Sequence, residues 1–576
     1  MSDKQGQRIS GAEILLEQLL LQGVDTIFGY PGGAIMPVYD KLYDYLDRLR
    51  HILVRHEQGA IHAAQGYARV KGVPGFVMVT SGPGATNVIT GVADAMIDST
   101  PVVVVAGQVS SSLLGTDAFQ ETDLIGMTTP ITKWSYQIRR PEDVAWAVSR
   151  AFYIAGSGRP GPVVLDFTKD AQTGLAEFVP SHCKFIRSYV ACPDPSEDDL
   201  KKAAEMIAAA KKPFVVYGQG ILLSGAEKEL AAFLDKGDLP AGSTLLGLSA
   251  LPSDDPHFRG MLGMHGNLAP NIMTQECDLL IAVGMRFDDR VTGKLETYAR
   301  NAKIIHIDID PSEIGKNVPV DLGILGDAKK VLGRLTELME KRTCPEWAME
   351  PILCNAVEKH KVIDPEIHPE AGPLNPGEVI AAVADACKGD AVILTDVGQN
   401  QMLAARYSRF CRSRSFISSG GLGTMGFGLP AAIGAKIAAP ERTVIAFIGD
   451  GGLQMTLQEL GTIMQEGTGV KIVLLNNNWL GNVRMWQELF FHERYSCTRM
   501  VNPDFKGIAD AFGIPCVNVE TREELPGAID QMLSGEGPFI LNAHVREESM
   551  VFPMIPPGRS VDEIMLNNKD WFEYGD

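Results

Sequence analysis

The chain has 576 residues, and a prior of about 150 residues per domain predicts three or four domains rather than one core. Its net charge of −19 and the lack of a basic patch argue against nucleic-acid binding as the main function. The nine cysteines form no CxxC pair and no metal-ligand spacing, and no signal peptide or membrane-spanning run is visible. We therefore expect a cytoplasmic protein with reduced thiols.

Helix and strand patterns alternate from about residue 8 to 185, which predicts a first domain built as a doubly wound parallel sheet. A helix is expected at 11–22 and a small-residue helix at 58–71. Glu57 follows an apolar run and is expected at the carboxyl end of a strand, where sites form in such folds. An acid in that position is ordinarily just exposed. The expected strands are 24–29, 52–56, 75–81, 101–107 and 163–167.

A second α/β domain is expected at 196–340, after a linker at 186–195 that carries two prolines. Its apolar runs predict strands at 213–217, 279–283 and 303–308. The first is followed by Gly218-Gln-Gly220, and the third ends at Asp308. A glycine-rich turn and an acid at a strand end are typical of dinucleotide binding, but the fingerprint is incomplete, so plain turn glycines remain an equal alternative.

A third domain is expected at 374–545, after a linker at 341–373, and is followed by an irregular tail or lid at 546–576. Its expected strands are 391–396, 443–449 and 470–475, with a continuous helix at 453–466. The segment 418–428 is rich in glycine, which predicts close approach of the backbone to a bulky group or several positive φ angles. The first and third domains have similar lengths, which hints at a duplicated module.

Asp450 and Asn477 each follow a buried strand of one βαβ unit in the third domain. The two strands are therefore expected to be parallel, with both residues at the same edge of the sheet. A carboxylate and an amide oxygen beside a glycine turn suit Mg²⁺ and a phosphate group. The alternative is a tight turn with a solvent-facing aspartate. The pair resembles the thiamine diphosphate signature, in which GDG is followed by NN about two dozen residues later.

Longer motifs extend this resemblance to nearly the whole chain: FGYPGG (28–33), RHEQG (55–59), GTDAFQE (115–121), GRPGP (158–162), RFDDRVTG (286–293), VRMWQ (483–487) and PMIP (553–556). With these motifs the chain is similar to the catalytic subunits of the acetohydroxyacid (acetolactate) synthase family. That family implies three doubly wound parallel-sheet domains of the thiamine diphosphate enzyme type. It also implies decarboxylation of pyruvate and transfer of the hydroxyethyl unit to a second pyruvate or to 2-ketobutyrate, the first common step toward valine, leucine and isoleucine. The motifs that carry the resemblance are spread from residue 28 to residue 556.

The resemblance assigns roles around thiamine diphosphate and Mg²⁺. Glu57 would hydrogen-bond the aminopyrimidine of cofactor held by the third domain of the other subunit of a dimer, and so activate it. Asp450, Asn477 and the main-chain carbonyl of Trp479 would hold Mg²⁺. Met425 would bend the cofactor, although a methionine in a loop also simply fills gaps. The residues implied along the cofactor are Gln399, Gly423, Gly451 and Gly452.

Two further sets of residues are implied by the same resemblance. Arg290 and Trp486 would receive the second 2-keto acid, although alone they would pass for a surface ion pair and a core aromatic. FAD would play a structural part without net redox chemistry. The remaining substrate-pocket residues would be Gly33, Phe119, Gln120 and Lys169, and the FAD residues would be Arg159, Gly218, Gly220, His265, Gly284, Arg286, Asp308 and Asp327.

The family also implies a homodimer or a dimer of dimers and a separate regulatory small subunit. Related flavin-containing enzymes, such as pyruvate oxidase or glyoxylate carboligase, remain alternatives, although Glu57 speaks against the carboligase. A scaffold protein on a decayed thiamine fold is a further alternative, against which Glu57, Asp450 and Asn477 speak. Five departures from the usual pattern leave substrate preference and inhibitor sensitivity open: Gln65, Ser110, Asn400, Trp479 and Asn482.

Overall fold

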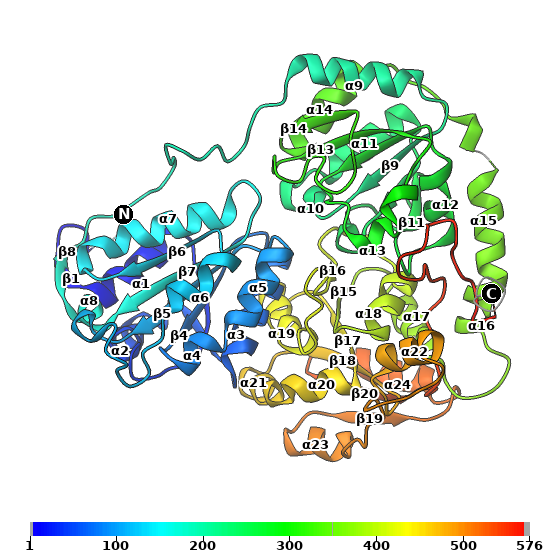
Figure 1. The fold of residues 1–576 in the computed structure, drawn as a ribbon. Helices are drawn as coiled ribbons and strands as arrows, with labels where there is room; N and C mark the ends of the chain where they lie inside the picture. The colour runs from blue at the N-terminus through cyan, green and yellow to red at the C-terminus, as the bar shows by residue number, and fades with distance from the viewer. Residues whose placement is uncertain (1–3, 348, 570–576) are drawn as a thin grey trace.

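The computed structural model describes residues 4–347 and 349–569, which form three α/β domains, each around a six-stranded parallel sheet (Figure 1). The predicted fold class is confirmed. The central strands are continuous apolar runs, as in β5 (Val102–Gln108), in which every residue is buried. Helices cover both faces of these sheets, and strands buried on both faces have no polar alternation.

The first domain has the strand order β3-β2-β4-β5-β7-β6. A short antiparallel pair, β1 (Arg8–Ser10) with β8 (Leu175–Glu177), closes its outer end. The strands are β2 (Thr26–Gly29), β3 (Arg50–Leu53), β4 (Gly75–Val79), β5, β6 (Trp134–Ile138) and β7 (Pro162–Thr168). The helices are α1 (Gly11–Leu21), α2 (Met36–Leu42), α3 (Glu57–Lys71), α4 (Pro83–Thr86), α5 (Ile89–Ile97), α6 (Leu124–Thr128), α7 (Val144–Gly156) and α8 (Lys169–Thr173).

The third domain repeats this topology with the order β16-β15-β17-β18-β20-β19. When each domain's strands are counted along the chain, both sheets have the order 2-1-3-4-6-5. The strands are β15 (Val392–Thr395), β16 (Phe416–Ile417), β17 (Val444–Gly449), β18 (Val470–Asn476), β19 (Cys516–Val519) and β20 (Phe539–His544). The helices are α17 (Pro376–Ala386), α18 (Gln399–Tyr407), α19 (Gly428–Ala438), α20 (Asp450–Thr456), α21 (Leu460–Glu466), α22 (Gly481–Phe490), α23 (Phe505–Ala511) and α24 (Leu525–Leu533).

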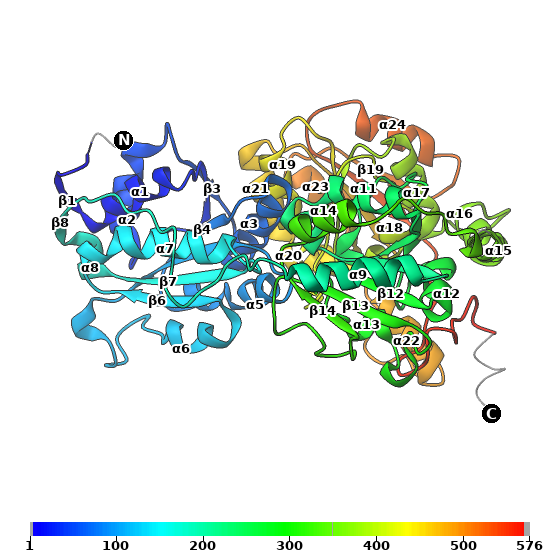
Figure 2. The same ribbon diagram turned by 90° about the horizontal axis from the view of Figure 1, so that it is seen from above.

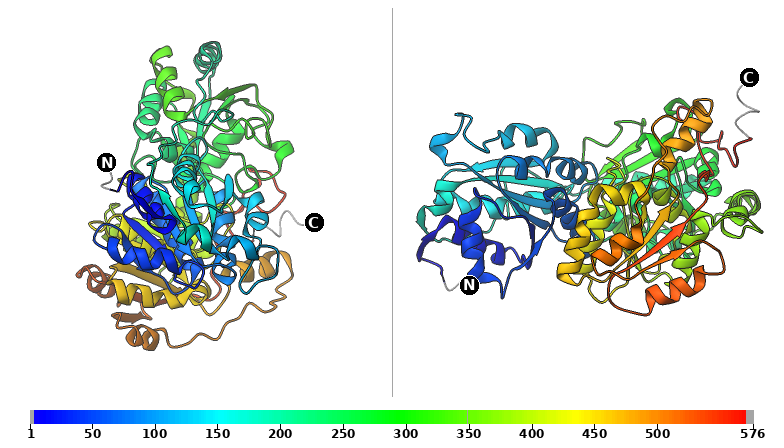
Figure 3. Two further views of the ribbon diagram at one scale, coloured as in Figure 1. Left: turned by 90° about the vertical axis from the view of Figure 1, so that its left-hand side faces the viewer. Right: turned by 90° about the horizontal axis from the view of Figure 1, so that it is seen from below.

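The central domain differs, because its order β11-β10-β9-β12-β13-β14 counts as 3-2-1-4-5-6, the order of dinucleotide-binding folds. Figure 3 shows it stacked on the third domain. The strands are β9 (Pro213–Tyr217), β10 (Ala241–Ser243), β11 (Phe258–Met261), β12 (Leu279–Val283), β13 (Lys303–Asp308) and β14 (Leu322–Leu325). The helices are α9 (Glu197–Ala209), α10 (Gly220–Ser224), α11 (Glu227–Gly237), α12 (Leu268–Glu276), α13 (Asp289–Thr292) and α14 (Ala328–Leu338).

Two expectations need correction. The helix expected at 453–466 is interrupted by a 3₁₀ turn, Leu457–Glu459, between α20 and α21. This break turns the buried Glu459 carboxylate to the first domain, where it accepts hydrogen bonds from the Arg55 amide at 3.1 and 3.2 Å. The expected linker at 341–373 contains helices α15 (Glu350–Glu358) and α16 (Asp364–Ile367).

The tail beyond β20 has no helix or strand in its described part, as the sequence predicted, but it is packed rather than free. It runs back from the third domain to the central domain, where Ile555 N donates to Met264 O at 2.8 Å and Lys294 N donates to Arg559 O at 2.9 Å. Val551, Met554 and Val561 are buried. The tail therefore joins the two domains.

Helices α3 and α19 join the first domain to the third, and Figure 2 shows this junction from above. The two helices approach closely because each has a glycine at the crossing. A Cβ on Gly66 would lie 2.0 Å from the Ala431 carbonyl oxygen, and one on Gly434 would lie 1.8 Å from that of Ala63. The junction therefore excludes any side chain at these positions.

Gly434→Ala should force α19 away from α3 and lower the free energy of unfolding by about 1–3 kcal/mol, measured by urea or thermal unfolding. Gly527→Ala is the matched control, since it lies in helix α24 and its Cβ would meet nothing within 4 Å. That control should be neutral or stabilising by about 0.5–1 kcal/mol. Equal effects of the two substitutions would contradict the close crossing.

Candidate active site

The edge of the third-domain sheet brings Asp450 and the asparagines after β18 together. Strands β17 and β18 are parallel, with Gly449 opposite Leu475. Asp450 Oδ1 accepts from its neighbour's amide, Gly451 N, at 2.9 Å, and Oδ2 accepts from Asn478 N at 2.7 Å. This edge lies where the strand order reverses between β15 and β17, the usual place for ligands in such sheets.

Asn477 and Gln399 lie beside Asp450 at the same edge. Asn477 Nδ2 is 3.5 Å from Gln399 Oε1, and Asn477 Oδ1 accepts from Trp479 N at 3.1 Å. A Cβ on Gly481 would meet Gln399 Oε1 at 2.2 Å, so α22 begins close against this pair. The resemblance assigns Asp450, Asn477 and Gln399 to one cofactor, and the three residues lie together in one chain.

The Asp450 carboxylate fits a divalent cation. Burial raises its pKa, and the hydrogen bonds that offset this come from neutral donors. A buried carboxylate without a cation is costly, so a bound metal ion would compensate its charge. The described residues contain no group of three or more His, Cys, Asp or Glu side chains placed to hold a metal. The ligands present are thus one carboxylate with amide and carbonyl oxygens, which suits Mg²⁺.

The glycine-rich segment lies next to this edge. A Cβ on Gly451 would lie 3.6 Å from Met425 Cε, so Met425 reaches the start of α20. Gly452 has no room for a side chain, because a Cβ would meet Asp396 Oδ1 at 2.5 Å. The Asp396 carboxylate accepts from Gly426 N and Gly428 N at 3.0 Å.

Sequence reasoning assigned no role to Asp396 or Asn502. Asp396 had a signal, because it follows β15 as Asp450 follows β17. Asn502 had none: it comes from a loop, and its Nδ2 donates to Asp450 Oδ2 at 2.6 Å and to Asn476 Oδ1 at 2.8 Å. It donates to the same Asp450 carboxylate oxygen as the Asn478 amide does, and it ties that oxygen to the end of β18.

Glu57 is the first residue of α3, and the strand before it, β3, ends at Leu53 rather than at the expected His56. His56 caps the helix, with its Nδ1 accepting from Gln58 N at 3.1 Å. Glu57 Oε2 accepts from Asn87 Nδ2 at 2.8 Å, and Oε1 lies 3.3 Å from a Cβ built on Gly84. Within the described residues, no hydrogen bond or ion pair joins Glu57 to the Asp450 edge of the same chain.

The other first-domain candidates lie in loops or at the start of a helix. A Cβ on Gly82 would lie 3.0 Å from Gln120, which itself has a positive φ of 60°. Phe119 is 87% exposed, and Lys169 begins α8 and is exposed. A Cβ on Gly33 would meet nothing within 4 Å. Gly33, Phe119 and Lys169 are thus exposed in the single chain, and Gln120 is half-buried.

A cavity of about 760 Å³ lies among the three domains, within the size range of cofactor sites. It is lined by seven of the eight residues that the resemblance assigned to FAD: Arg159, Gly220, His265, Gly284, Arg286, Asp308 and Asp327. Gly423, Arg290 and Trp486 also line it. The Arg290 guanidinium lies 5.9 Å from the centre of the Trp486 ring.

Gly218, Gly220 and Gly284 of the central domain allow two turns to pack closely. A Cβ on Gly218 would lie 2.5 Å from Gly284 O, and one on Gly220 would lie 2.6 Å from Gly284 Cα. The turns after β9 and β12 therefore touch through their backbones, which forms the floor of the cavity. Asp327 has a local role as well, because it caps α14.

The polar groups of the cavity fit a large ligand with polar ends. Trp486 Nε1 and Asn482 Oδ1 are buried without a hydrogen-bond partner among the described residues, which is rare in folded proteins. Arg159 pairs with Glu313 at 2.6 Å and with Asp310 at 3.2 Å. Burial lowers the pKa of His265 to about 3, so its ring is neutral.

The chain matches the thiamine pyrophosphate enzyme family in three parts: the N-terminal TPP binding domain over residues 9–127, the central domain over 200–335 and the C-terminal TPP binding domain over 396–543. It is 46% identical over 561 residues to the acetolactate synthase large subunit of Parasynechococcus marenigrum, which covers 96% of this chain and 90% of that protein. It is 44% identical over 564 residues to the isozyme 2 large subunit of Escherichia coli, covering 97% and 99%.

The chain belongs to the acetolactate synthase large-subunit family. The Lactococcus lactis large subunit is a further relative, 42% identical over 557 residues with 96% of each chain covered. Membership of this family confirms the resemblance read from the sequence, and it gives the chain two thiamine pyrophosphate-binding domains. Of the helices in the described residues, none has both the length and the apolar character that crossing a bilayer requires.

The Asp308→Asn substitution should show how much the buried carboxylate of Asp308 lowers the free energy of unfolding. Burial raises the pKa of the Asp308 carboxyl to about 6, above its ordinary value, so the ionised form destabilises the fold at pH 8 and the penalty disappears as pH falls through 6 toward 4. The asparagine should therefore raise the free energy of unfolding by about 1–2 kcal/mol at pH 8 and by little near pH 4, measured by urea unfolding. Asp235→Asn, at an exposed position of the same domain, is the matched control.

Proposed function

We propose that this chain is the catalytic subunit of an acetolactate synthase, which decarboxylates pyruvate and transfers the two-carbon unit to a second pyruvate or to 2-ketobutyrate. This would be the first common step of valine, leucine and isoleucine synthesis, in the cytoplasm. One observation carries the proposal: Asp450, Asn477 and Gln399 stand together at the strand-order reversal in a chain that aligns with acetolactate synthase large subunits over 96–97% of its length.

Asp450, Asn477 and the Trp479 carbonyl would hold Mg²⁺ against a diphosphate. Asn502 and the Asn478 amide fix the Asp450 carboxylate in one orientation, so its oxygens are positioned before a metal arrives. Gly451 and Gly452 are the second and third residues of α20, where backbone amides would favour an anion such as a phosphate group. Met425 would support the cofactor between its two rings.

Glu57 would hold a proton at the pyrimidine end of cofactor bound by the partner subunit. When bound, thiamine diphosphate supplies the carbon nucleophile and the electron sink for the decarboxylation. Asn87 orients the Glu57 carboxylate, which keeps it aimed at one position. The absence of a contact between Glu57 and Asp450 in one described chain supports a site shared between two copies, and hence a homodimer or a dimer of dimers.

Arg290 and Trp486 would select the second keto acid, because a guanidinium binds a carboxylate and an indole packs against a short alkyl group. Gly33, Phe119, Gln120 and Lys169 would complete the pocket from the partner subunit. Exposed Phe119 would then be covered and would exclude water, which protects the carbanion-like reaction step from protonation.

FAD would occupy the cavity among the domains and would have a structural role. The cavity size, the dinucleotide-type strand order and the unpartnered Trp486 and Asn482 atoms support this assignment. Asp308, the last residue of β13, would accept a hydrogen bond from a ribose hydroxyl. A separate regulatory small subunit is proposed because the relatives are named large subunits.

Glu57→Gln should lower the rate of acetolactate formation by at least about a hundredfold. The substitution removes the carboxylate that holds the proton but keeps the shape of the side chain. Acetolactate is measured as acetoin after acid treatment, with pyruvate, thiamine diphosphate, Mg²⁺ and FAD supplied. Thiamine diphosphate should still bind, as followed by tryptophan fluorescence. Glu177→Gln, an exposed glutamate of the same domain, should leave the rate unchanged. An unaltered rate in the Glu57 variant, or peroxide in place of acetolactate from the unmodified protein, would refute the proposal.

Asp450→Asn should weaken thiamine diphosphate binding in the presence of Mg²⁺ by about tenfold or more, because the metal loses its charged ligand. Titrating Mg²⁺ at fixed cofactor should show the loss as a higher metal requirement. Asp530→Asn, at an exposed position of the same domain, serves as the control. If both variants titrate like the unmodified protein, Asp450 does not hold the metal.

A further inference from the structure

The loop 418–428 of the third domain lies between both candidate ligand sites. It connects β16 to α19 and contains four glycines before α19 begins at Gly428. Gly420, Gly421 and Gly423 line the large cavity on one side, and Met425 reaches Gly451 on the other. Such a segment has high conformational freedom, so something outside it must fix its shape.

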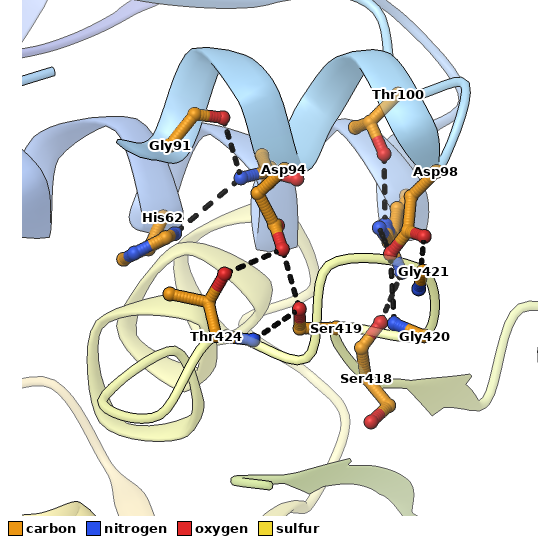
Figure 4. Close-up of polar contacts among 12 residues, drawn as sticks. His62, Gly91, Asp94, Asp98, Thr100, Ser418, Ser419, Gly420, Gly421 and Thr424 are labelled. Atoms are coloured by element: carbon orange, nitrogen blue, oxygen red, sulfur yellow. Dashed lines mark hydrogen bonds and ion pairs between the residues drawn. The ribbon is translucent and has the colours of Figure 1, made fainter. Parts of the chain in front are cut away.

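Two aspartates of the first domain hold this loop, and Figure 4 shows both carboxylates pointing from α5 and the turn after it to the loop. Asp98 Oδ2 accepts from Gly420 N at 2.9 Å, and Oδ1 accepts from Gly421 N at 2.7 Å. Asp98 is 1% exposed. Its two oxygens therefore fix two consecutive glycine amides.

Asp94, one turn earlier on α5, holds the next part of the loop. Its Oδ1 accepts from the Ser419 hydroxyl and, at 2.9 Å, from Thr424 Oγ1. Ser419 Oγ in turn accepts from Thr424 N at 2.8 Å, which closes the loop on itself. The Asp94 carboxylate is fully buried.

Arg69 of α3 completes the contact. Its Nη2 pairs with Asp98 Oδ2 at 2.8 Å, its Nη1 donates to Ser418 O at 2.6 Å, and its Nε donates to Thr100 Oγ1 at 3.0 Å. The guanidinium neutralises one of the two buried carboxylates. The first domain thus contacts the loop at its start and at Thr424, while Asp396 holds its end.

The turn after α5 also reaches the cavity. Ser99 has a φ of +54°, a sparsely populated conformation for a residue with a side chain, and its hydroxyl accepts from Arg159 Nε at 2.9 Å. Arg159 lines the cavity, and so do Asp98 and Ser99. One strained turn therefore connects the loop to the wall of the cavity.

We propose that Asp94, Asp98 and Arg69 are positioning residues that hold the loop 418–424 in the shape that binds thiamine diphosphate. This rests on the proposed function only in that the loop borders the cofactor. Buried ion pairs and carboxylates are a poor source of net stability compared with apolar packing, so their presence here indicates a need for one defined geometry. The first domain then acts twice: through Asp94 and Asp98 on its own chain's loop, and through Glu57 on the partner's cofactor.

The test uses the full chain with Asp98→Asn and the milder Ser419→Ala, and Asp47→Asn as an exposed control in the same domain. Thiamine diphosphate with Mg²⁺ is titrated by tryptophan fluorescence, and hydrogen exchange is followed in peptides that cover 416–428. We expect the dissociation constant to rise about tenfold in Asp98→Asn and about fivefold in Ser419→Ala. The reason is that, in a fraction of the molecules, the loop must be reordered when the cofactor binds. The kcat at saturating cofactor should stay within about twofold.

The exchange of 416–428 should speed up in the apo variants while peptides from α3 and α5 keep their protection. Faster exchange throughout the first domain would show a merely structural role and overturn the proposal. The proposal would also be overturned if both variants kept the thiamine diphosphate dissociation constant and the hydrogen exchange of 416–428 of the unmodified protein. If the unmodified protein binds thiamine diphosphate but makes no acetolactate, the proposed function fails, whereas weaker cofactor binding by the two variants would still support the positioning role.

Discussion

The structure depends first on the parallel pairing of β17 with β18. This pairing ends both strands at one edge, so that Asp450 and Asn477, which are separated in sequence by helices α20 and α21, lie close enough to bind one ligand. A carboxylate buried there without a charged partner is costly. A bound cation would offset the cost of burying the Asp450 carboxylate. The neighbouring Asn502 side chain and backbone amides hold this carboxylate in one orientation.

A second constraint is the close crossing of α3 and α19. Glycines at the crossing let the first domain approach the third within backbone contact distance. The same approach brings α5 over the glycine-rich loop, so that Asp94 and Asp98 reach amides and hydroxyls more than three hundred residues away. Glu459 meanwhile accepts from the Arg55 amide just before α3, and the Glu57 carboxylate is bound by Asn87 rather than by a residue of the Asp450 edge of its own chain.

The three domains share an architecture but differ in strand order, and this difference matches their sites. The first and third sheets have one order, which agrees with the similarity in length noted from the sequence. The central sheet has the dinucleotide-binding order, and the cavity opens at the carboxyl ends of its strands. The incomplete glycine fingerprint is explained by packing, since Gly218 and Gly220 press on Gly284.

The sequence by itself determined the fold class, the family and the neighbourhood of Asp450 and Asn477, because alternating apolar runs and strand-end residues are local patterns. It also named the residues around the large cavity, through motifs that carry a family resemblance. Only the tertiary structure decided the order of strands, the break after α20, the start of α3 at Glu57, and the parts played by Asp396, Asn502, Asp94 and Asp98. These depend on contacts between segments far apart in the chain, and the close approach of domains that creates them leaves no periodic signal in the sequence.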